Sequence, residues 1–410
     1  MEKSRKPKIR FKGFTDDWEQ RKLKDLVDRV VRKNTNCEST LPLTISAQYG
    51  LVDQVTYFNN RVASRDVTNY YLVLNGEFAY NKSTSDGYPF GAVKRLDMYK
   101  KGVLSTLYIV FVPKDKYRVN SDFLTIFFDT NRWHKGVADR AAEGARNHGL
   151  LNITADDFFD IDLLLPKEIV EQVKIGEFVQ KLDHLITLHQ RKLDTLINVK
   201  KSMLEKMFPK QGSKVPEIRF NGFTDDWEQR KLGELLTKYT DEVNVPHNGY
   251  ERLGIRSHAK GTFHSYVSEG HELQTGKMHR VAADKFIVNI TFGWEHAVAV
   301  TDKNDAGKLV SHRFPQYSLS ENLYSKFFKY IILDDKFKHH LWLSSPGGAG
   351  RNRVLKLNEM LEYKIKIPNV QEQQKIAKVL MDLDNLITLH QRKLEKLKNI
   401  KKSMLEKMFI

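Results

Sequence analysis

Basic and aromatic side chains gather in one stretch of the first half of the chain. Between Asn81 and Lys101 there are five lysine or arginine residues, and Tyr80, Tyr88 and Phe90 stand among or beside them. Lysine and arginine neutralise phosphates, while tyrosine, serine and asparagine side chains can contact the edges of bases. The stretch therefore favours contact with a nucleic acid, and an ordinary solvated loop is the alternative.

A glycine-rich loop in the second half offers chemistry of the same kind. Residues 346–350 read PGGAG and precede Arg351 and Arg353. A glycine backbone can approach a phosphate closely, and the two arginines add positive charge. The counterpart in the first half is AAEGARNH at 141–148. A tight turn that makes no contacts is the alternative for both loops.

The sequence lacks the motifs that would make it an enzyme by itself. Adjacent prolines do not occur, so the Asp/Asn-Pro-Pro-aromatic motif with which amino-methyltransferases hold the target amine is missing. There is also no GxxxxGK[ST] phosphate-binding loop. Glu362 and Lys364 have the ExK spacing of metal-dependent nucleases, but their counterparts are Asp160 and Asp162. We therefore expect no catalytic residue in this chain.

Histidine is common in the second half, where nine of the 14 histidines lie between His247 and His340. None of them has the HExxH spacing of a zinc site, and Cys37 is the single cysteine. One cysteine can form neither an internal disulfide nor a CxxC metal site. We expect dispersed histidines on a surface, no metal site and no cofactor bound by this chain.

The composition restricts the class of protein and of partner. With 410 residues, the chain is long enough for two or three domains with separate cores. Its formal net charge of +16 favours a polyanionic partner over a membrane. No apolar run approaches the roughly 20 residues that span a bilayer, and the charged first 26 residues do not resemble a secretory signal. We expect a cytoplasmic protein.

The sequence contains two near copies of one unit. Residues 9–26 and 218–235 are identical at 15 of 18 positions, and residues 171–208 and 372–409 are identical at 26 of 38. The segments between these blocks are almost unrelated, with FAYN and FIVN among the few matches. Two domains of one fold have therefore diverged while their connecting segments stayed alike.

Each copy ends in a segment with the heptad spacing of a coiled coil. Its apolar positions alternate by four and three residues and are Leu182, Ile186, Leu193, Leu196, Met203 and Met207, then Leu383, Ile387, Leu394, Leu397, Met404 and Met408. One histidine and one lysine interrupt each series, namely His189, Lys200, His390 and Lys401. Because one helix cannot bury its stripe alone, we expect the two to pack antiparallel, with the histidines fixing their register. A 38-residue helix would be a spacer of about 57 Å.

Shorter periodic runs predict the elements of the two globular domains. The expected strands are Tyr70–Leu74, Glu77–Asn81, Thr106–Val112, Asp160–Leu165, Lys285–Ile290, His296–Thr301 and Tyr363–Ile367, and the expected helices are Asp122–Trp133 and Asn322–Ile332. Each GFTDDWEQRKL block predicts a short helix, because Asp16 and Glu19 have capping-box spacing, as do their counterparts. Trp18 and Trp227 should then have the same surroundings in the two halves.

Together these features resemble a known family. The IRFxGFTDDWEQRKL block, the two diverged domains, the EQxKI motif and a long helix that closes in KKSMLEKMF are similar to the specificity (HsdS) subunits of type I restriction-modification systems. The resemblance covers the whole chain and both repeats. It implies an α+β fold with two similar globular α/β target recognition domains. A pair of long antiparallel coiled-coil helices would separate them, and a pseudo-twofold internal repeat would relate them.

The resemblance also implies partners and their chemistry. Each target recognition domain would read one half of a bipartite, asymmetric site in double-stranded DNA. The helices would set the gap between the halves and dock two modification subunits, which methylate adenine. Restriction subunits, which are ATP-driven translocases joined to a nuclease, would cleave unmodified DNA. The complex would use S-adenosylmethionine, with ATP and Mg²⁺ for restriction, whereas this chain would bind no cofactor.

On this basis the chain divides into six predicted segments. They are a repeat block at 1–26, target recognition domain 1 at 27–166, a central coiled-coil helix and linker at 167–216, the second repeat block at 217–235, target recognition domain 2 at 236–368 and a C-terminal coiled-coil helix at 369–410.

The residues that contact DNA do not follow from the resemblance, because recognition domains vary where they touch DNA. We therefore choose candidates from their chemistry. In the first domain they are Lys82, Ser83, Tyr88, Lys94, Arg95, Arg146 and Asn147. In the second domain they are His258, Lys260, Asn289, Trp294, His296, Arg351 and Arg353.

Two other classes of function stay open. A non-enzymatic scaffold could use two globular arms to bind proteins across a coiled-coil rod, and it would show no salt-dependent affinity for DNA. A nuclease or methyltransferase acting alone would need a catalytic constellation that the sequence lacks.

Overall fold

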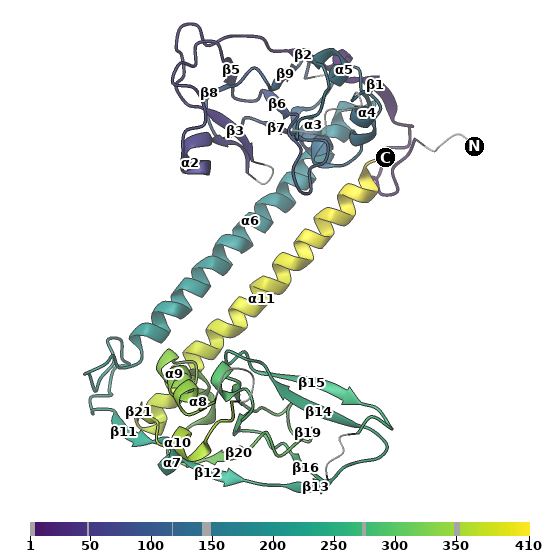
Figure 1. The fold of residues 1–410 in the computed structure, drawn as a ribbon. Coiled ribbons are helices and arrows are strands. Elements are labelled where there is room, and N and C mark those ends of the chain that lie inside the picture. The colour runs from purple at the N-terminus through teal and green to yellow at the C-terminus, as the bar shows by residue number, and fades with distance from the viewer. Residues whose placement is uncertain (1–4, 47–48, 117, 142–148, 273–275, 348–352) are drawn as a thin grey trace. The chain divides into compact units, whose positions relative to one another are not determined.

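The structure is a computed structural model that describes residues 5–46, 49–116, 118–141, 149–272, 276–347 and 353–410. The chain forms two units, of which the first contains residues 1–190 and 392–410 and the second contains residues 191–391. Two long helices, α6 (Ile169–Lys206) and α11 (Val370–Met408), each contribute residues to both units (Figure 1).

The first unit is a mixed domain of short strands and helices. Its elements before α6 are β1 (Glu19–Lys22), α1 (Leu23–Leu26), β2 (Val27–Arg29), β3 (Leu43–Ser46), β4 (Gly50–Asp53), α2 (Gln54–Phe58), β5 (Tyr71–Leu74), β6 (Phe78–Asn81), β7 (Ala92–Arg95), β8 (Lys101–Leu104), β9 (Ile109–Pro113), α3 (Ser121–Asp129), α4 (His134–Ala138), α5 (Ala155–Phe159) and β10 (Asp162–Leu165). Its largest sheet is antiparallel, with four strands in the order β2-β9-β6-β7. Three smaller sheets pair β1 with β10, β3 with β4, and β5 with β8.

The second unit has the same kinds of element. They are β11 (Glu228–Lys231), α7 (Leu232–Leu235), β12 (Leu236–Tyr239), β13 (Glu242–Asn244), β14 (Tyr250–Ile255), β15 (Thr262–Val267), β16 (Lys277–Arg280), β17 (Lys285–Val288), the 3-10 turn η2 (Gly293–Glu295), β18 (Val298–Val300), β19 (Leu309–Val310), β20 (Gln316–Leu319), α8 (Ser325–Ile331), α9 (Asp335–Leu343), α10 (Leu357–Leu361) and β21 (Lys364–Ile367). One antiparallel sheet has the order β12-β20-β17-β18, and a five-stranded sheet has the order β13-β16-β19-β14-β15.

The four-stranded sheets of the two units have equivalent strand orders. β2, β9, β6 and β7 of the first correspond to β12, β20, β17 and β18 of the second. The FAYN match is the whole of the central strand β6, and the FIVN match covers the last three residues of β17 and Asn289 after it; Phe78 and Phe286 of these matches are fully buried. The predicted mixed fold class and the common fold of the two diverged domains are therefore confirmed. The units differ mainly in their outer strands, which form two separate pairs in the first and one larger sheet in the second.

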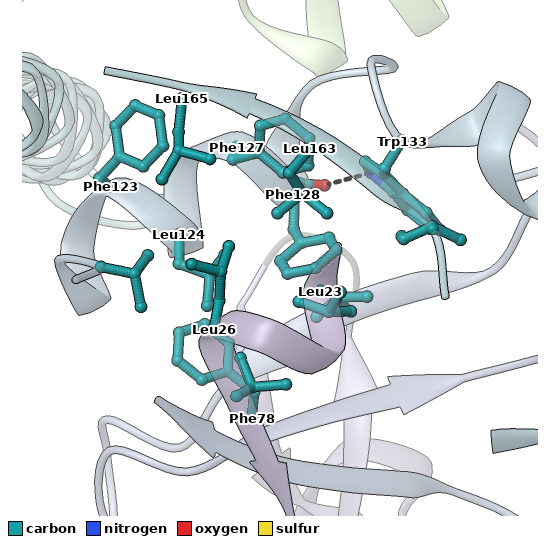
Figure 2. Close-up of a cluster of buried hydrophobic side chains, with 14 of the residues drawn as sticks. Leu23, Leu26, Phe78, Phe123, Leu124, Phe127, Phe128, Trp133, Leu163 and Leu165 are labelled. Carbon is teal, nitrogen blue, oxygen red and sulfur yellow. Dashed lines mark hydrogen bonds between the residues drawn. The ribbon is translucent and has the colours of Figure 1, made fainter. Parts of the chain in front are cut away.

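Aromatic side chains fill the core of the first unit (Figure 2). Phe78 of β6 stacks on Phe111 of β9 with a distance of 5.3 Å between the ring centres. Helix α3 adds Phe127 and Phe128, and the indole N–H of Trp133 donates to the Phe128 carbonyl oxygen at 3.1 Å. Burial of each large apolar side chain stabilises the fold by roughly 1.5–3 kcal/mol, so this core holds the sheet from which the loops leave.

The repeat block folds differently from the prediction. Residues 19–22 form strand β1, which pairs antiparallel with β10, and the helical turn α1 starts only at Leu23. The block in the second unit pairs β11 with β21 in the same register. The expected helix after Asp16 is therefore wrong, because the pairing with β10 satisfies the backbone groups that a capped helix would have used.

The end of a long helix packs on the tryptophan of each repeat block. Trp18 lies edge-on to Phe409, just after α11, with 6.0 Å between the ring centres. Trp227 lies edge-on to Phe208, just after α6, at the same distance. The two tryptophans therefore have equivalent surroundings, as the repeat predicts.

The EQxKI motif fastens the start of each long helix to its domain. Glu171 is buried and accepts two hydrogen bonds from the Arg10 guanidinium, at 2.6 and 2.8 Å. Gln172 accepts a hydrogen bond from the Asn120 amide at 2.8 Å and donates to the Pro166 carbonyl oxygen at 2.9 Å. The same contacts recur in the second unit, where the residues are Glu372, Arg219, Gln373, Tyr324 and Pro368.

The predicted seam between the long helices is confirmed within each unit. Leu182 of α6 and Leu394 of α11 are buried in the first unit, and Leu193 and Leu196 of α6 are buried in the second. Both histidines of the two series are half-buried. The lysines that interrupt the series form ion pairs with aspartates of the opposite helix.

Candidate nucleic-acid interface

In the first unit, the candidate residues lie on the loop that follows β6. The carboxamide oxygen of Asn81 accepts a hydrogen bond from the Ser83 amide at 3.0 Å, which turns the chain out of the sheet. The Thr84 amide then donates to the Gly149 carbonyl oxygen at 2.7 Å, and the Leu151 amide donates to that of Lys82 at 3.0 Å. The loop after β6 is therefore fixed beside the chain at 149–151.

This loop presents polar and aromatic side chains to solvent. Ser83 and Tyr88 are exposed, and Lys82 is half-buried with its ammonium group donating to the Ile153 carbonyl oxygen at 3.3 Å. These three candidates are therefore brought together. Arg146 and Asn147 lie outside the described residues.

Lys94 and Arg95 have a different role from the predicted one. The Lys94 ammonium lies 2.6 Å from an Asp129 carboxylate oxygen, and Arg95 pairs with Asp97 at 2.6 Å and Asp122 at 2.8 Å. Both basic side chains are mostly buried. Their charge is thus used to fasten β7 to α3 and its surroundings, so we remove them from the set of candidates for DNA contact.

In the second unit, an equivalent loop leaves β17. The carboxamide oxygen of Asn289 accepts a hydrogen bond from the Thr291 amide at 3.0 Å, as Asn81 does in the first unit. Asn289 is buried, so its amide serves the turn and is not available to a base. The faint match between FAYN and FIVN therefore marks the turn that opens this loop in both domains.

His296, another candidate of the second unit, also has a structural role. It is 3% exposed, and its Nε2 donates to the Ile332 carbonyl oxygen at 2.7 Å. Burial lowers the pKa of the His296 imidazole below its ordinary value. A neutral, buried imidazole that anchors α8 cannot contact DNA from this position, and we remove it from the candidates as well.

The remaining candidates of the second unit gather around η2. The Ser257 hydroxyl donates to a Glu295 carboxylate oxygen at 2.5 Å, and the His258 amide donates to the Glu295 carbonyl oxygen at 2.8 Å. These bonds place the turn that carries His258 and Lys260, both exposed, beside Trp294 of η2. The indole N–H of Trp294 donates to the Thr291 carbonyl oxygen at 3.2 Å.

Arg353 completes this cluster. Its guanidinium carbon lies 5.9 Å from the ring centre of Trp294 and 5.1 Å from that of Trp342, which belongs to α9. Arg351 lies outside the described residues. The second unit therefore joins basic and aromatic groups from three separate segments on one surface.

Other kinds of site are not evident in the described part of the chain. Among the described residues, there is no group of three or more histidine, cysteine, aspartate or glutamate side chains that could hold a metal ion. No helix there is long and apolar enough to cross a membrane.

The sequence matches the family described as type I restriction modification DNA specificity domain at residues 15–198 and again at 224–399. The chain belongs to this family. It is a specificity subunit of a type I restriction-modification system, and each of its two units carries one DNA recognition domain.

Two curated relatives come from Methanocaldococcus jannaschii. The type I restriction enzyme MjaVIII specificity subunit is 22% identical over 321 residues, which cover 75% of this chain and 73% of the relative. A second sequence, provisionally named as the specificity subunit of type I restriction enzyme MjaX, is 22% identical over 408 residues and covers 95% and 92%. The crystal structure of the type I restriction-modification S subunit from M. genitalium has a TM-score of 0.56 at 14% identity and covers 99% of both chains, so the two share a fold.

Sequence reasoning missed part of the surface of this specificity subunit. Trp342 is 45% exposed and comes from a helix that carries none of the predicted candidates. His339 stacks on it at 6.0 Å with 12° between the ring planes, and Phe292 is exposed beside η2. An exposed tryptophan is itself a signal of an interface, but its proximity to Arg353 follows only from the fold.

Proposed function

We propose that this specificity subunit reads a split, asymmetric DNA site, one half with each recognition domain. The observation that carries the proposal is that equivalent loops after β6 and β17 begin with the same asparagine turn and then present different side chains. The loop of the first unit offers Lys82, Ser83 and Tyr88. The second unit offers Trp294 and Arg353. One scaffold with two different sets of contacts is suited to two different DNA half-sites.

We also propose that the chain docks two copies of one modification subunit. Leu185 and Leu188 of α6 are 41% and 54% exposed in the first unit. Their repeat equivalents in α11, Leu386 and Leu389, are 43% and 45% exposed in the second unit. All four belong to the LITLHQRKL segments, which are identical in the two repeats. Exposed leucines at identical places are typical of interfaces, and a repeated surface binds the same protein twice.

We assign the catalytic steps to the modification and restriction subunits. The modification subunits would use S-adenosylmethionine to methylate adenine, and restriction subunits would use ATP and Mg²⁺ to translocate and cleave unmodified DNA. This chain would bind neither cofactor and catalyse no step. The long helices α6 and α11, of 38 and 39 residues, would set the gap between the two half-sites. The complex would work in the cytoplasm, where the host DNA is.

The test is to co-express the chain with a candidate modification subunit of the same genome and to sequence methylated adenines in the DNA of the host. The expected result is one new methylated motif, made of two unlike half-sites with a fixed unspecific gap. The chain without its partner should give no methylation. A stable complex that binds DNA without any such motif would contradict the proposal.

A further inference from the structure

Arg353 of the second unit is covered by indole rings. Its guanidinium carbon lies 5.1 Å from the ring centre of Trp342 and 5.9 Å from that of Trp294. These distances are within the range of cation–π contacts. The guanidinium is flat, and its N–H groups point outward in its own plane, so contacts with ring faces leave these donors available.

The Trp294 indole is held through its N–H, which donates to the Thr291 carbonyl oxygen at 3.2 Å. The η2 turn that carries Trp294 packs closely on the chain that follows Arg353, because a Cβ added at Gly293 would lie 2.9 Å from the Leu355 Cβ. The Leu355 amide also donates to the Ile290 carbonyl oxygen at 2.9 Å.

The other indole, Trp342, belongs to helix α9 and stacks on His339. The guanidinium is therefore restricted before any ligand arrives, and a restricted side chain loses less entropy on binding.

Arg353 has different partners from Arg95 of the first unit, which has a structural role. Arg95 is paired with Asp97 and Asp122. No carboxylate among the described residues forms an ion pair with Arg353, whose neighbours are rings. A positioned guanidinium without a carboxylate partner has its donors available for an external acceptor.

We propose that Arg353 reads a guanine in the half-site of the second recognition domain, an inference that rests on the proposed function. Guanine presents two acceptors, O6 and N7, on one planar edge in the major groove, and arginine meets both at once. A phosphate can also accept two arginine donors, but its oxygens can be approached from many directions, so it does not require a guanidinium held in one plane. The two indoles restrict the guanidinium in the way that a planar base edge requires.

The first experiment uses the unmodified complex and the site found by methylation sequencing. Each guanine of the second half-site is replaced in turn by 7-deazaguanine, which lacks the N7 acceptor, and the affinity for each duplex is measured. We expect one replacement to weaken binding about fivefold or more. A second half-site without guanine would overturn the proposal, and so would a half-site whose guanines all tolerate the replacement.

The second experiment assigns the effect to Arg353. The R353K complex keeps the positive charge but loses the paired, planar N–H donors of the guanidinium. In this complex the critical 7-deazaguanine should weaken DNA binding less than about twofold. Methylation should also spread to sites with other bases at that position. Lys260→Gln, which removes an exposed charge, should instead weaken binding to all duplexes alike. An R353K complex that is weakened evenly, with its motif unchanged, would show phosphate contact and refute the proposal. The proposed function itself would fail differently, since the unmodified complex would then yield no split motif.

Discussion

Lys401 of α11 lies with its ammonium nitrogen 2.6 Å from a carboxylate oxygen of Asp183 on α6, within the first unit. Their repeat equivalents form the same pair in the second unit, where Lys200 lies 2.6 Å from Asp384. Each lysine occupies a position of the helical seam that is otherwise apolar, and each is only about a fifth exposed. In each unit an ion pair therefore crosses the seam, because the partner of each lysine is on the other helix.

The first prediction concerns these ion pairs. Asp183→Ala leaves Lys401 half-buried without its partner, so we expect the first unit to lose about 1 kcal/mol and to melt earlier in thermal denaturation. Asp384→Ala should cost more, because Asp384 also accepts a hydrogen bond from the Tyr330 hydroxyl at 2.8 Å. Asp382→Ala is the matched control, since its pair with Lys378 is exposed. Equal melting temperatures for all three variants would contradict the prediction.

The sequence was sufficient to predict those parts of the fold that repeat or have a strong period. The two blocks, the seam and several strands were readable, since β5, β6, β17 and β18 lie within or next to the predicted runs. Strand β1 was not, because its EQRK sequence has no apolar alternation and forms a strand only through its pairing with β10. Tertiary pairing there overrides the local capping signal.

The candidate site was predicted less well, for a physical reason. Chemistry identifies which side chains can contact DNA, but only burial decides which ones are free to do so. In the second unit, Asn289 is buried in a turn, and His296 is buried and bonded to the Ile332 carbonyl oxygen. In the first unit, Lys94 is paired with Asp129. Trp342 joins the surface through packing of α9 against η2, which no local pattern encodes.

A second prediction tests the role of the EQxKI motif. Gln172 is fully buried and satisfies both the Asn120 amide and the Pro166 carbonyl oxygen. Gln172→Leu leaves these groups unpaired, so we expect a loss of about 2–3 kcal/mol in the free energy of unfolding, measured by denaturant titration. Gln374→Leu, at an exposed position of α11, should change it by less than about 0.5 kcal/mol. A Gln172→Leu variant as stable as this control would refute the role of the motif.

The third prediction is a pH dependence that comes from His296. Burial is the main cause of its lowered pKa, the nearby charges of Lys338 and His258 lower it further, and the Ile332 carbonyl and Asp335 oppose the shift. The folded state thus prefers the neutral imidazole, whose pKa is about 6.5 in an unfolded chain. The stability that the neutral imidazole contributes to the folded state is complete above that pH and is lost as the pH falls through the lowered pKa of the folded state.

The measurement for this prediction is the melting temperature between about pH 8 and pH 5. The unmodified chain should lose more stability on acidification than His296→Gln, which cannot titrate. His312→Gln removes an exposed histidine and should keep the acid sensitivity of the unmodified chain. Identical pH profiles for the unmodified chain and His296→Gln would contradict the assignment.

The fourth prediction concerns the repeated leucines of the long helices. Leu188→Asp and Leu389→Asp each place a charge on an exposed apolar position of one repeat, so each should remove one of two modification subunits from the complex. Native mass spectrometry should count two partners for the unmodified chain, one for each single variant and none for the double variant. Leu107→Asp, which is 62% exposed in the first unit and lies outside the repeats, should retain both. If each single variant lost both partners, the two docking surfaces would not be independent, and if neither lost any, the partners would dock elsewhere.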